Sequence, residues 1–322
     1  IVSFMDLGEE SRISSTHWTP NPTYPNPCNN SNDLLRTVKD QYPDARDISQ
    51  VTQVLAPLQA YGIEGGKDYE KIESARLLSS NEYTLNSSLG YISIKSALNA
   101  DEVLAVAYEY TYRGQVYQVG EFSGDITETD KALYVKMLKG TTVNPRLPIW
   151  DLMMKNVYNL GGYQIQKEKF KFNIKYLSDT TGTKINYLPI PGLNDKSLLQ
   201  VMNLDRLDSQ QDSNPDGFFD FVEGYTILSA TGKVIFPVVE PFGSHLESVI
   251  TDPVQREHYC YPQLYDSTLV VARQFADKNK FVMDGEYQAS SGSQIRLNAM
   301  NVPRGSVVVT AGGVTLTLAL SP

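Results

Sequence analysis

Cysteine and histidine are scarce: the 322 residues include two Cys and three His. Cys28 and Cys260 lie far apart, so they form either one disulfide in an oxidising compartment or two unrelated thiols. A zinc site normally needs about four closely spaced Cys or His ligands. His258, two residues before Cys260, lacks such neighbours. The sequence therefore predicts no zinc centre.

Long apolar runs and clusters of basic residues are also missing. No stretch approaches the roughly 18 consecutive apolar residues of a membrane helix, and residues 1–10 lack the basic and apolar regions of a signal peptide. We therefore expect an excised or mature soluble piece of a protein. With 28 Lys and Arg against 37 Asp and Glu, the net charge is −9. We expect no nucleic-acid binding, because it needs clustered Lys and Arg to neutralise phosphates and the sequence has no such cluster.

Catalytic motifs are not evident either. Ser244 and His245 are adjacent, but a G-x-S-x-G elbow is absent, and adjacency in sequence does not produce a triad. We expect His245 to pack or cap near the start of a short helix. Gly65-Gly66-Lys67 lacks the frame of a phosphate-binding loop. The sequence thus predicts a non-enzyme, and a secreted hydrolase is an alternative that turnover on a substrate panel would reveal.

What the sequence does contain is tyrosine, 20 residues of it, largely in alternating runs that favour strands. Residues 101–112 and 115–120 flank Arg113-Gly114, which predicts a β-hairpin. Residues 170–176 alternate with a period of two and predict another strand. Further strands are expected near residues 280–287 and 306–316. The predicted class is α+β, β-dominated, a mosaic of small antiparallel sheets with two or three packing helices.

Three helices are predicted by apolar spacing and by end signals. The first has Asp47 as its N-cap and ends at Gly62, and the others span residues 147–160 and 264–278. Residues 1–44 are rich in proline and asparagine and are expected to form an extended arm or irregular loop. The predicted divisions are this arm (residues 1–45), a β-rich module (46–145), an α+β module (146–250) and a helix with C-terminal hairpins (251–322).

One pattern occurs twice. Tyr83-Thr84 is followed by Gly90 and then Ile92, and Tyr225-Thr226 is followed by Gly232 and then Val234 at the same offsets. Each copy predicts a strand, a turn in which glycine supplies a positive φ, and a second strand. Two explanations stay open: two similar hairpins that arose by chance, or a repeated β-rich module.

Residues 212–223 match the spacing of a calcium-binding loop, D-x-[DN]-x-[DN]-G-x5-E. Alternate side chains of such a loop converge on one centre, and its final glutamate closes the coordination shell. The predicted ligands are side-chain oxygens and one backbone carbonyl, from Asp212, Asn214, Asp216, Phe218, Asp220 and Glu223. Calcium (Ca2+) is therefore the one cofactor that the sequence suggests.

An ion-free turn explains the same residues and is the favoured alternative. Asp, Asn and Gly are common turn residues, the flanks do not predict a helix pair, and Pro215 stiffens the loop. If calcium binds, we expect a structural role instead of sensing, because no switchable helix pair is evident. Asp205 and Asp208, just upstream, add to the negative field.

Tyr108, Tyr110 and Tyr112 fall on one side of the same predicted strand. Packing in a core or at a sheet edge is the favoured explanation of such a row. A face that stacks on sugars is the alternative, and it would suit a calcium-stabilised surface adhesin or glycan-binding module. Loss of glycan binding on replacing Tyr108 or Tyr110 with alanine would distinguish the two.

A series of stretches between residues 68 and 313 forms one further pattern. The stretches are Asp68–Glu73, Ala75–Leu78, Leu89–Ser93, Asn99–Val106, Tyr117–Phe122, Trp150–Tyr158, Asn203–Leu207, Pro215–Gly224, Glu240–Leu246, Leu264–Thr268 and Asn301–Gly313. Taken in this order, they resemble the SprA/Sov family of gliding-motility and type IX secretion proteins. Residues 1–44 match nothing familiar, and residues 316–322 depart from the family pattern.

The resemblance implies a parent chain from the Bacteroidota that forms a large outer-membrane export channel. This chain would be a soluble region of it, at the outer membrane or cell surface, on either the periplasmic or the extracellular face. Implied partners are the remainder of the outer-membrane barrel, accessory secretion lipoproteins and exported cargo proteins. The family has no catalytic residues to transfer, and its signature includes the acidic motif of residues 212–223. The implied function is a non-catalytic scaffold or gating region.

Overall fold

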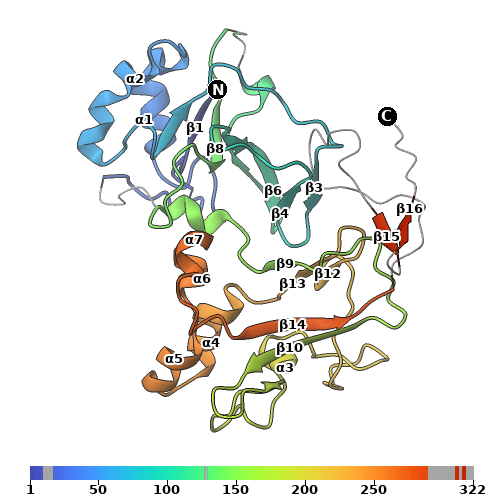
Figure 1. Cartoon of the computed structure of the whole chain (residues 1–322). Helices are drawn as coiled ribbons and strands as arrows, with labels where there is room; N and C mark the ends of the chain where they lie inside the picture. Colours follow the sequence, from blue (N-terminus) through green and yellow to red (C-terminus); the bar gives the residue numbers. More distant parts are fainter. Residues whose placement is uncertain (10–16, 127, 129, 289–308, 312–313, 317–322) are drawn as a thin grey trace.

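The computed structural model describes residues 1–9, 17–126, 128, 130–288, 309–311 and 314–316. Two hydrophobic clusters organise these residues, one built from residues 2–149 and the other from residues 172–272. They occupy separate halves of the molecule, which Figure 1 shows above and below one another. Helix and strand each account for little more than a fifth of the chain, about 21% and 22%. The predicted mosaic α+β class is confirmed, with strand only slightly in excess.

A four-stranded sheet, in the order β2-β1-β8-β5, forms the core of the N-terminal half. Strand β1 pairs antiparallel with β2 and parallel with β8. Short helices cover this sheet, because Leu34, Leu35 and Val38 share one helix face and are buried against it. The elements are β1 (Val2–Phe4), α1 (Leu34–Gln41), η1 (Pro43–Arg46), α2 (Val51–Val54), η2 (Ala56–Tyr61), β2 (Tyr69–Lys71), β5 (Leu104–Val106) and β8 (Tyr134–Lys139).

The expectation of an extended or irregular arm over residues 1–44 is wrong at both ends of that segment. Residues 2–4 form β1 in the interior of the sheet, and residues 34–41 form α1. Proline density misled the prediction because the prolines all lie between these two elements or after them. The irregular description holds for residues 20–32, where Asn21 N–H donates to the carbonyl of Ser31 and closes a loop.

Two separate hairpins complete the N-terminal half. The predicted hairpin around Arg113-Gly114 is confirmed as β6 (Tyr108–Tyr112) paired with β7 (Gln115–Val119), but the predicted strand at 101–112 is broken, because β5 pairs with β8 instead. Arg113 and Gly114 both have positive φ, at 50° and 81°, which suits the right-handed twist of a hairpin with a two-residue turn. The other hairpin joins β3 (Tyr83–Asn86) to β4 (Tyr91–Ile94). Short 3-10 turns follow: η3 (Ser123–Asp125) and η4 (Pro148–Leu152).

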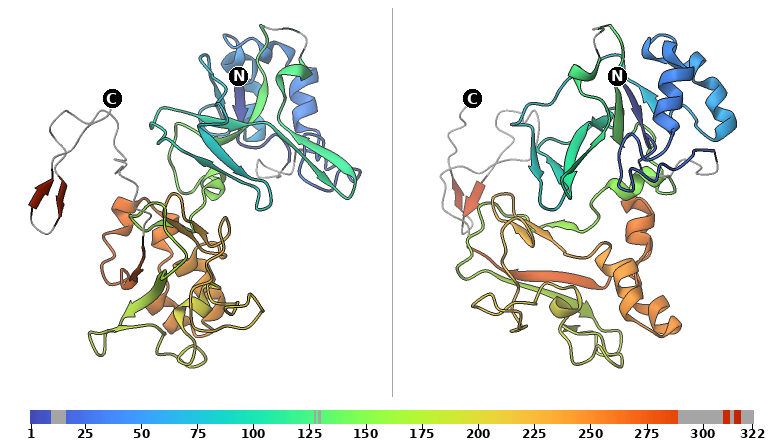
Figure 2. Two further views of the ribbon diagram at one scale, coloured as in Figure 1. Left: turned by 90° about the vertical axis from the view of Figure 1, so that its right-hand side faces the viewer. Right: turned by 180° about the vertical axis from the view of Figure 1, so that it is seen from behind.

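Two three-stranded sheets, β11-β10-β14 and β12-β13-β9, lie in the C-terminal half. The predicted strand at residues 170–176 is confirmed, and Phe172, Ile174 and Tyr176 point into the core. The elements are β9 (Val157–Asn159), β10 (Lys171–Leu177), β11 (Lys184–Ile185), α3 (Leu198–Val201), β12 (Ile227–Leu228), β13 (Lys233–Ile235), η5 (Pro241–His245), α4 (Leu246–Val249), α5 (Pro253–Tyr259), α6 (Gln263–Asp266), α7 (Leu269–Ala272) and β14 (Phe281–Glu286). Figure 2 shows α4, α5 and α6 gathered at one end of β14.

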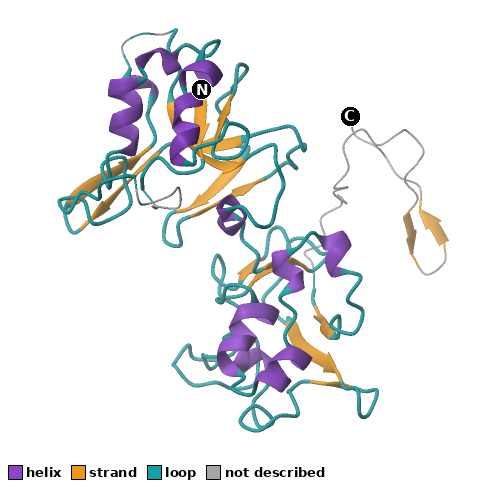
Figure 3. Cartoon of the chain, turned by 90° about the vertical axis from the view of Figure 1, so that its left-hand side faces the viewer, coloured by secondary structure: helices purple, strands orange, loops and turns teal. Residues whose placement is uncertain are grey.

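All three predicted helices are shorter or more broken than expected (Figure 3). Pro57 divides the first into α2 and η2, because it has no N–H for the bond to residue 53. Gln50, not Asp47, is the N-cap of α2, while the end at Gly62 is confirmed. The helix predicted at 147–160 is wrong, since only η4 forms and β9 follows. The helix predicted at 264–278 breaks into α6 and α7 where Ser267 is extended.

The repeated pattern forms a hairpin in both places. Gly90 and Gly232 take the predicted positive φ, at 69° and 62°. The two hairpins differ in context, because β13 also pairs with β9 whereas β3 and β4 pair only with each other. The structure adds no feature beyond the hairpins themselves that favours a repeated module. Strand β15 (Val309–Ala311) and strand β16 (Val314–Leu316) pair as a further hairpin within the predicted 306–316 segment, of which residues 306–308 and 312–313 lie outside the described residues.

Candidate functional site: carboxylate clamps between distant segments

Asp205 is a buried carboxylate with 1% of its surface exposed. Its Oδ1 accepts a hydrogen bond from the Asp216 N–H at 3.0 Å, and its Oδ2 accepts one from the Gly217 N–H at 3.1 Å. Both oxygens therefore hold the start of the turn at residues 216–217 against the chain at residue 205. A buried carboxylate needs such donors, because removal from water without them is costly.

Asp220 joins the same two segments, but here the carboxylate belongs to the later segment and the N–H donors to the earlier one. Its Oδ2 accepts a hydrogen bond from the Arg206 N–H at 2.7 Å, and both of its oxygens accept from the Leu207 N–H at 3.2 Å. Its own N–H donates to the carbonyl of Leu204 at 2.8 Å. Together Asp205 and Asp220 form the aspartate clamp. In the described part of the chain, no basic side chain is ion-paired with either carboxylate.

The pKa of Asp220 lies above its usual value. Burial is the main cause, and the neighbouring carboxylates of Asp205 and Asp216 add to it, while the hydrogen bonds from Arg206 and Leu207 oppose it. Ionised Asp220 is thus held by backbone N–H groups against an unfavourable field.

The predicted calcium ligands are spread along the same loop. Asp212, Asn214 and Asp216 are exposed, and Phe218 is 71% exposed. Asp216 accepts from the Phe218 N–H, and both oxygens of Glu223 accept from the Ser229 N–H at 3.1 Å. Within the residues that the structure describes, no three acidic, histidine or cysteine side chains gather as a metal-binding group. The calcium site therefore stays a prediction.

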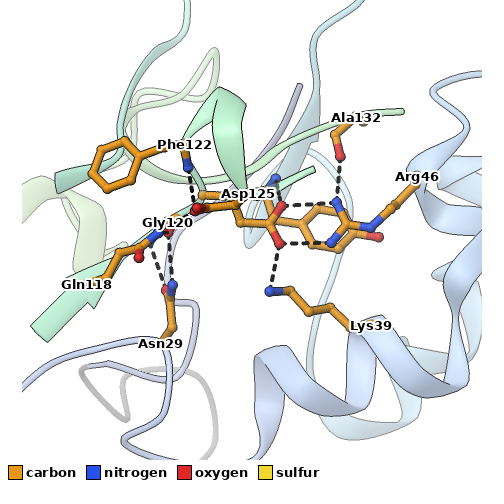
Figure 4. A network of polar contacts seen from close by, with 10 residues as sticks. Asn29, Lys39, Arg46, Gln118, Gly120, Phe122, Asp125 and Ala132 are labelled. Atoms are coloured by element: carbon orange, nitrogen blue, oxygen red, sulfur yellow. Dashed lines mark hydrogen bonds and ion pairs between the residues drawn. The ribbon is translucent and has the colours of Figure 1, made fainter. Parts of the chain in front are cut away.

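Glu121 is the centre of a second clamp, in the N-terminal half. Arg46 binds it bidentately, with N–O distances of 3.0 and 2.8 Å, and Lys39 of α1 lies 2.7 Å from its Oε1. Figure 4 shows Arg46 and Lys39 approaching the same carboxylate. The N–H of Tyr134 in β8 also donates to it, at 2.9 Å. This Glu121 clamp therefore fastens the helices to the end of β7 and to β8.

Arg46 contributes more than charge to the Glu121 clamp. Its guanidinium donates to the carbonyl of Ala132 at 2.9 Å and lies 4.4 Å from the centre of the Tyr134 ring. Burial opposes ionisation of Glu121, but the hydrogen bonds from Arg46, Lys39 and Tyr134 outweigh it, so that the pKa of Glu121 is lowered. Bidentate, charge-assisted contacts of this kind are the strong ones.

The loop at residues 20–32 is fastened beside the Glu121 clamp. Asn29 exchanges two hydrogen bonds with Gly120 through its side-chain amide, and its own N–H donates to the carbonyl of Gln118 at 2.7 Å. Asp125 accepts from Gln118 Nε2 at 2.6 Å and from the Phe122 N–H at 2.9 Å (Figure 4). Asn29 is also the asparagine of an N-x-S glycosylation tripeptide, and its side-chain amide is engaged in these hydrogen bonds.

The remaining residues considered for chemistry make contacts within the protein. His245 is the N-cap residue of α4 and its Nε2 lies 2.7 Å from the carbonyl of Val201, which agrees with the packing interpretation. His258 lies 3.1 Å from the carboxylate of Asp179. Cys28 and Cys260 are buried and unpaired, and burial raises the pKa of the Cys260 thiol to about 11.

The tyrosine row lies on one side of the β6–β7 hairpin, as predicted. Tyr110 stacks on Tyr117 with ring centres 5.2 Å apart, and Tyr108 stacks on Tyr110 at 6.4 Å. Because the rings stack on one another, their inner faces are covered. The arrangement favours packing over a flat platform for sugars.

A scan against models of protein families found no match, and a search of curated proteins found none either. In the described residues, no helix has the length and apolar content to cross a membrane.

Sequence reasoning missed the Glu121 clamp. Arg46 and Lys39 lie 75 residues or more before Glu121, and no local spacing links them. Asp205 carries a better signal, because it lies only 11 residues before Asp216 and belongs to the same acidic stretch as the predicted calcium loop.

Proposed function

We propose that this chain is a non-catalytic scaffold region of an outer-membrane protein-export channel, as its resemblance to the SprA/Sov family suggests. One observation supports a scaffold in particular. The buried carboxylates of Glu121 and Asp205 and the half-buried carboxylate of Asp220 hold distant backbone segments together. Side chains arranged in this way stabilise a fixed loop framework, on which neighbouring barrel strands, accessory lipoproteins or exported proteins would rest.

The test uses the full-length parent protein in its native host. We expect Glu121→Ala in the parent to reduce export of proteins that carry a C-terminal secretion signal, with those proteins retained in the periplasm. The amount of parent protein in the outer-membrane fraction is measured in the same cells, so that export is expressed per channel. Glu82→Ala is the matched control, because Glu82 pairs with Arg76 on the surface.

The result that contradicts the proposal is normal export per channel in a variant whose isolated region is shown to be unfolded. A parent protein that fractionates with the cytoplasm would contradict it equally. For the enzyme alternative, the chain is incubated with ester, peptide and glycoside substrates. We expect no saturable turnover, and turnover abolished by Ser244→Ala would instead establish a hydrolase.

A further inference from the structure

Strand β6 belongs to a two-stranded sheet and pairs on one side only, with β7. The residues that flank the two-residue turn, Tyr112 and Gln115, lie directly opposite each other. Every second residue of β6, counted back from Tyr112, therefore exchanges backbone hydrogen bonds with β7. The N–H and C=O groups of the residues between them, Glu109 and Thr111, point away from β7.

The two outer edges of this hairpin differ. On the β7 side, the carbonyl of Gln118, which lies opposite Glu109, accepts a hydrogen bond from the Asn29 N–H at 2.7 Å. On the β6 side, no hydrogen bond from the described residues reaches the backbone of Glu109 or Thr111, and both residues are exposed. The hairpin is thus covered along β7 and open along β6.

The open edge is suited to receive another strand. Lysine, proline and bulges are the features that normally keep an edge strand from pairing. Strand β6 reads Tyr-Glu-Tyr-Thr-Tyr, has neither residue type, and pairs with β7 without a shift in register. A two-stranded sheet by itself is only marginally stable in water. A further strand along β6 would therefore satisfy the exposed backbone groups and stabilise the hairpin.

The sequence of β6 is complementary to itself in the antiparallel direction. When two copies pair about Tyr110, Glu109 of each copy lies opposite Thr111 of the other, and these residues exchange their backbone hydrogen bonds. Each glutamate then faces a neutral hydroxyl side chain, whereas a facing glutamate would be destabilising. The two Tyr110 residues form the central pair, and Tyr112 of each copy lies opposite Tyr108. The register thus matches tyrosine with tyrosine on one face and carboxylate with hydroxyl on the other.

We propose that the open edge of β6 binds the same edge of a second copy of this chain, antiparallel and centred on Tyr110. The product is a continuous sheet in the order β7-β6-β6-β7. A pair of strands of 5 residues buries less surface than a stable interface needs, so the dimer is weak, with a dissociation constant on the order of 100 µM. An extended segment of another protein is the alternative occupant, and it has no need of the self-matched register.

The experiment is sedimentation equilibrium of the whole chain over concentrations from about 5 to about 500 µM, a range that brackets the expected dissociation constant. We expect a monomer–dimer equilibrium with no larger species, because pairing covers the open edge of both copies. A chain that stays monomeric over the whole range would overturn the proposal. Open-ended association beyond the dimer would overturn it as well.

Substitutions at residue 111 test the register. Thr111→Lys places an ammonium group opposite Glu109 in both halves of the symmetric pair and should tighten dimerisation about fivefold. Thr111→Glu places carboxylate against carboxylate and should weaken it about fivefold. Thr84→Lys and Thr84→Glu, at an exposed position of β3, change the net charge equally and should leave the dissociation constant unchanged. A change in the same direction for both Thr111 variants, or equal effects at the two positions, would contradict the register.

A backbone variant tests the hydrogen bonds themselves. Thr111→Pro removes an N–H that points away from β7, so the β6–β7 ladder keeps its bonds while each copy loses a donor to the other. We expect dimerisation to weaken about tenfold, with an unchanged far-ultraviolet circular dichroism spectrum. Thr111→Val, which keeps the N–H, is the matched control and should still dimerise. Dimerisation that survives Thr111→Pro in a folded chain would place the interface elsewhere and contradict the assignment. If proline disturbs the hairpin, the Lys and Glu variants decide, because both keep the backbone N–H.

Discussion

In the N-terminal half, the carboxylate of Glu121 meets two cationic side chains, whereas Asp205 and Asp220 in the C-terminal half meet only backbone N–H groups. Both arrangements fasten segments that lie apart in the sequence. The Glu121 clamp neutralises the buried charge, and its carboxylate is easier to ionise than usual. The aspartate clamp leaves the charge uncompensated, and Asp220 is harder to ionise. The two halves therefore respond differently to mutation, pH and cations.

Removal of Glu121 should have the largest effect. Glu121→Ala leaves the half-buried Arg46 beside Tyr134 without its carboxylate. Breaking one partner of a buried ion pair costs about 3–5 kcal/mol of the free energy of unfolding, and partial exposure of Arg46 places the loss at the lower end. Urea unfolding followed by circular dichroism measures the loss. Glu82→Ala, at an exposed ion pair, should leave the midpoint nearly unchanged. Equal urea midpoints for Glu121→Ala and Glu82→Ala would show that the Glu121 clamp does not stabilise the N-terminal half.

Asp205→Asn should have the next largest effect, confined to the C-terminal half. One amide oxygen replaces two carboxylate oxygens, so that either the Asp216 or the Gly217 N–H loses its acceptor. An unsatisfied buried donor costs about 1–3 kcal/mol of unfolding free energy. The same unfolding measurement on Asp212→Asn, in the exposed part of the loop, is the control. A larger loss in the control would place the stabilising contacts elsewhere.

The two clamps should respond to acid in opposite directions. The lowered pKa of Glu121 means that its contribution is present above its unfolded pKa and is lost as the pH falls through the folded pKa. The raised pKa of Asp220 means that its ionised form costs stability, and this cost disappears as the pH falls through its folded pKa.

Thermal melts from pH 7 to pH 3 measure this contrast. The destabilisation caused by Glu121→Gln should shrink as the pH falls below about 4.5, and that caused by Asp220→Asn should grow as the pH falls. Parallel trends in the two variants would contradict the difference between the clamps.

Calcium should have the smallest effect. Asp220 and Glu223 already accept backbone hydrogen bonds, and the acidic side chains of the loop do not gather, so we expect no saturable heat from calcium below about 1 mM and no change in the melting temperature. Titration into chelator-treated protein measures both. Saturable binding and a raised melting temperature, both removed by Asp216→Ala, would establish the calcium loop that the sequence predicts.

Local signals predicted part of this fold well. The alternation at residues 170–176 and the Arg113-Gly114 turn each reported a structure formed by neighbouring residues, and both are confirmed. Helix lengths failed where one residue decides the outcome, as at Pro57 and Ser267. The arm failed because the pairing of β1 with β2 and β8 joins residues more than 60 positions apart.

The candidate site divides in the same way. The acidic loop was recognisable as a motif, and its carboxylates accept hydrogen bonds mostly from backbone N–H groups nearby in the sequence. The motif could not distinguish these partners from an ion, because both satisfy carboxylate oxygens. The Glu121 clamp and the pairing of Glu9 with Lys136 depend on contacts across the sheet, which no spacing in the sequence encodes.

The central claim is that each half is held by its own carboxylate clamp, and the two cysteines test it directly. Cys28 lies beside Asn29 in the N-terminal half, Cys260 is part of the C-terminal cluster, and both are buried. The measurement is the rate at which a thiol reagent labels each cysteine, resolved by mass spectrometry. Glu121→Ala should accelerate labelling of Cys28 alone, and Asp205→Asn should accelerate labelling of Cys260 alone. Equal acceleration of both thiols in either variant would contradict the claim.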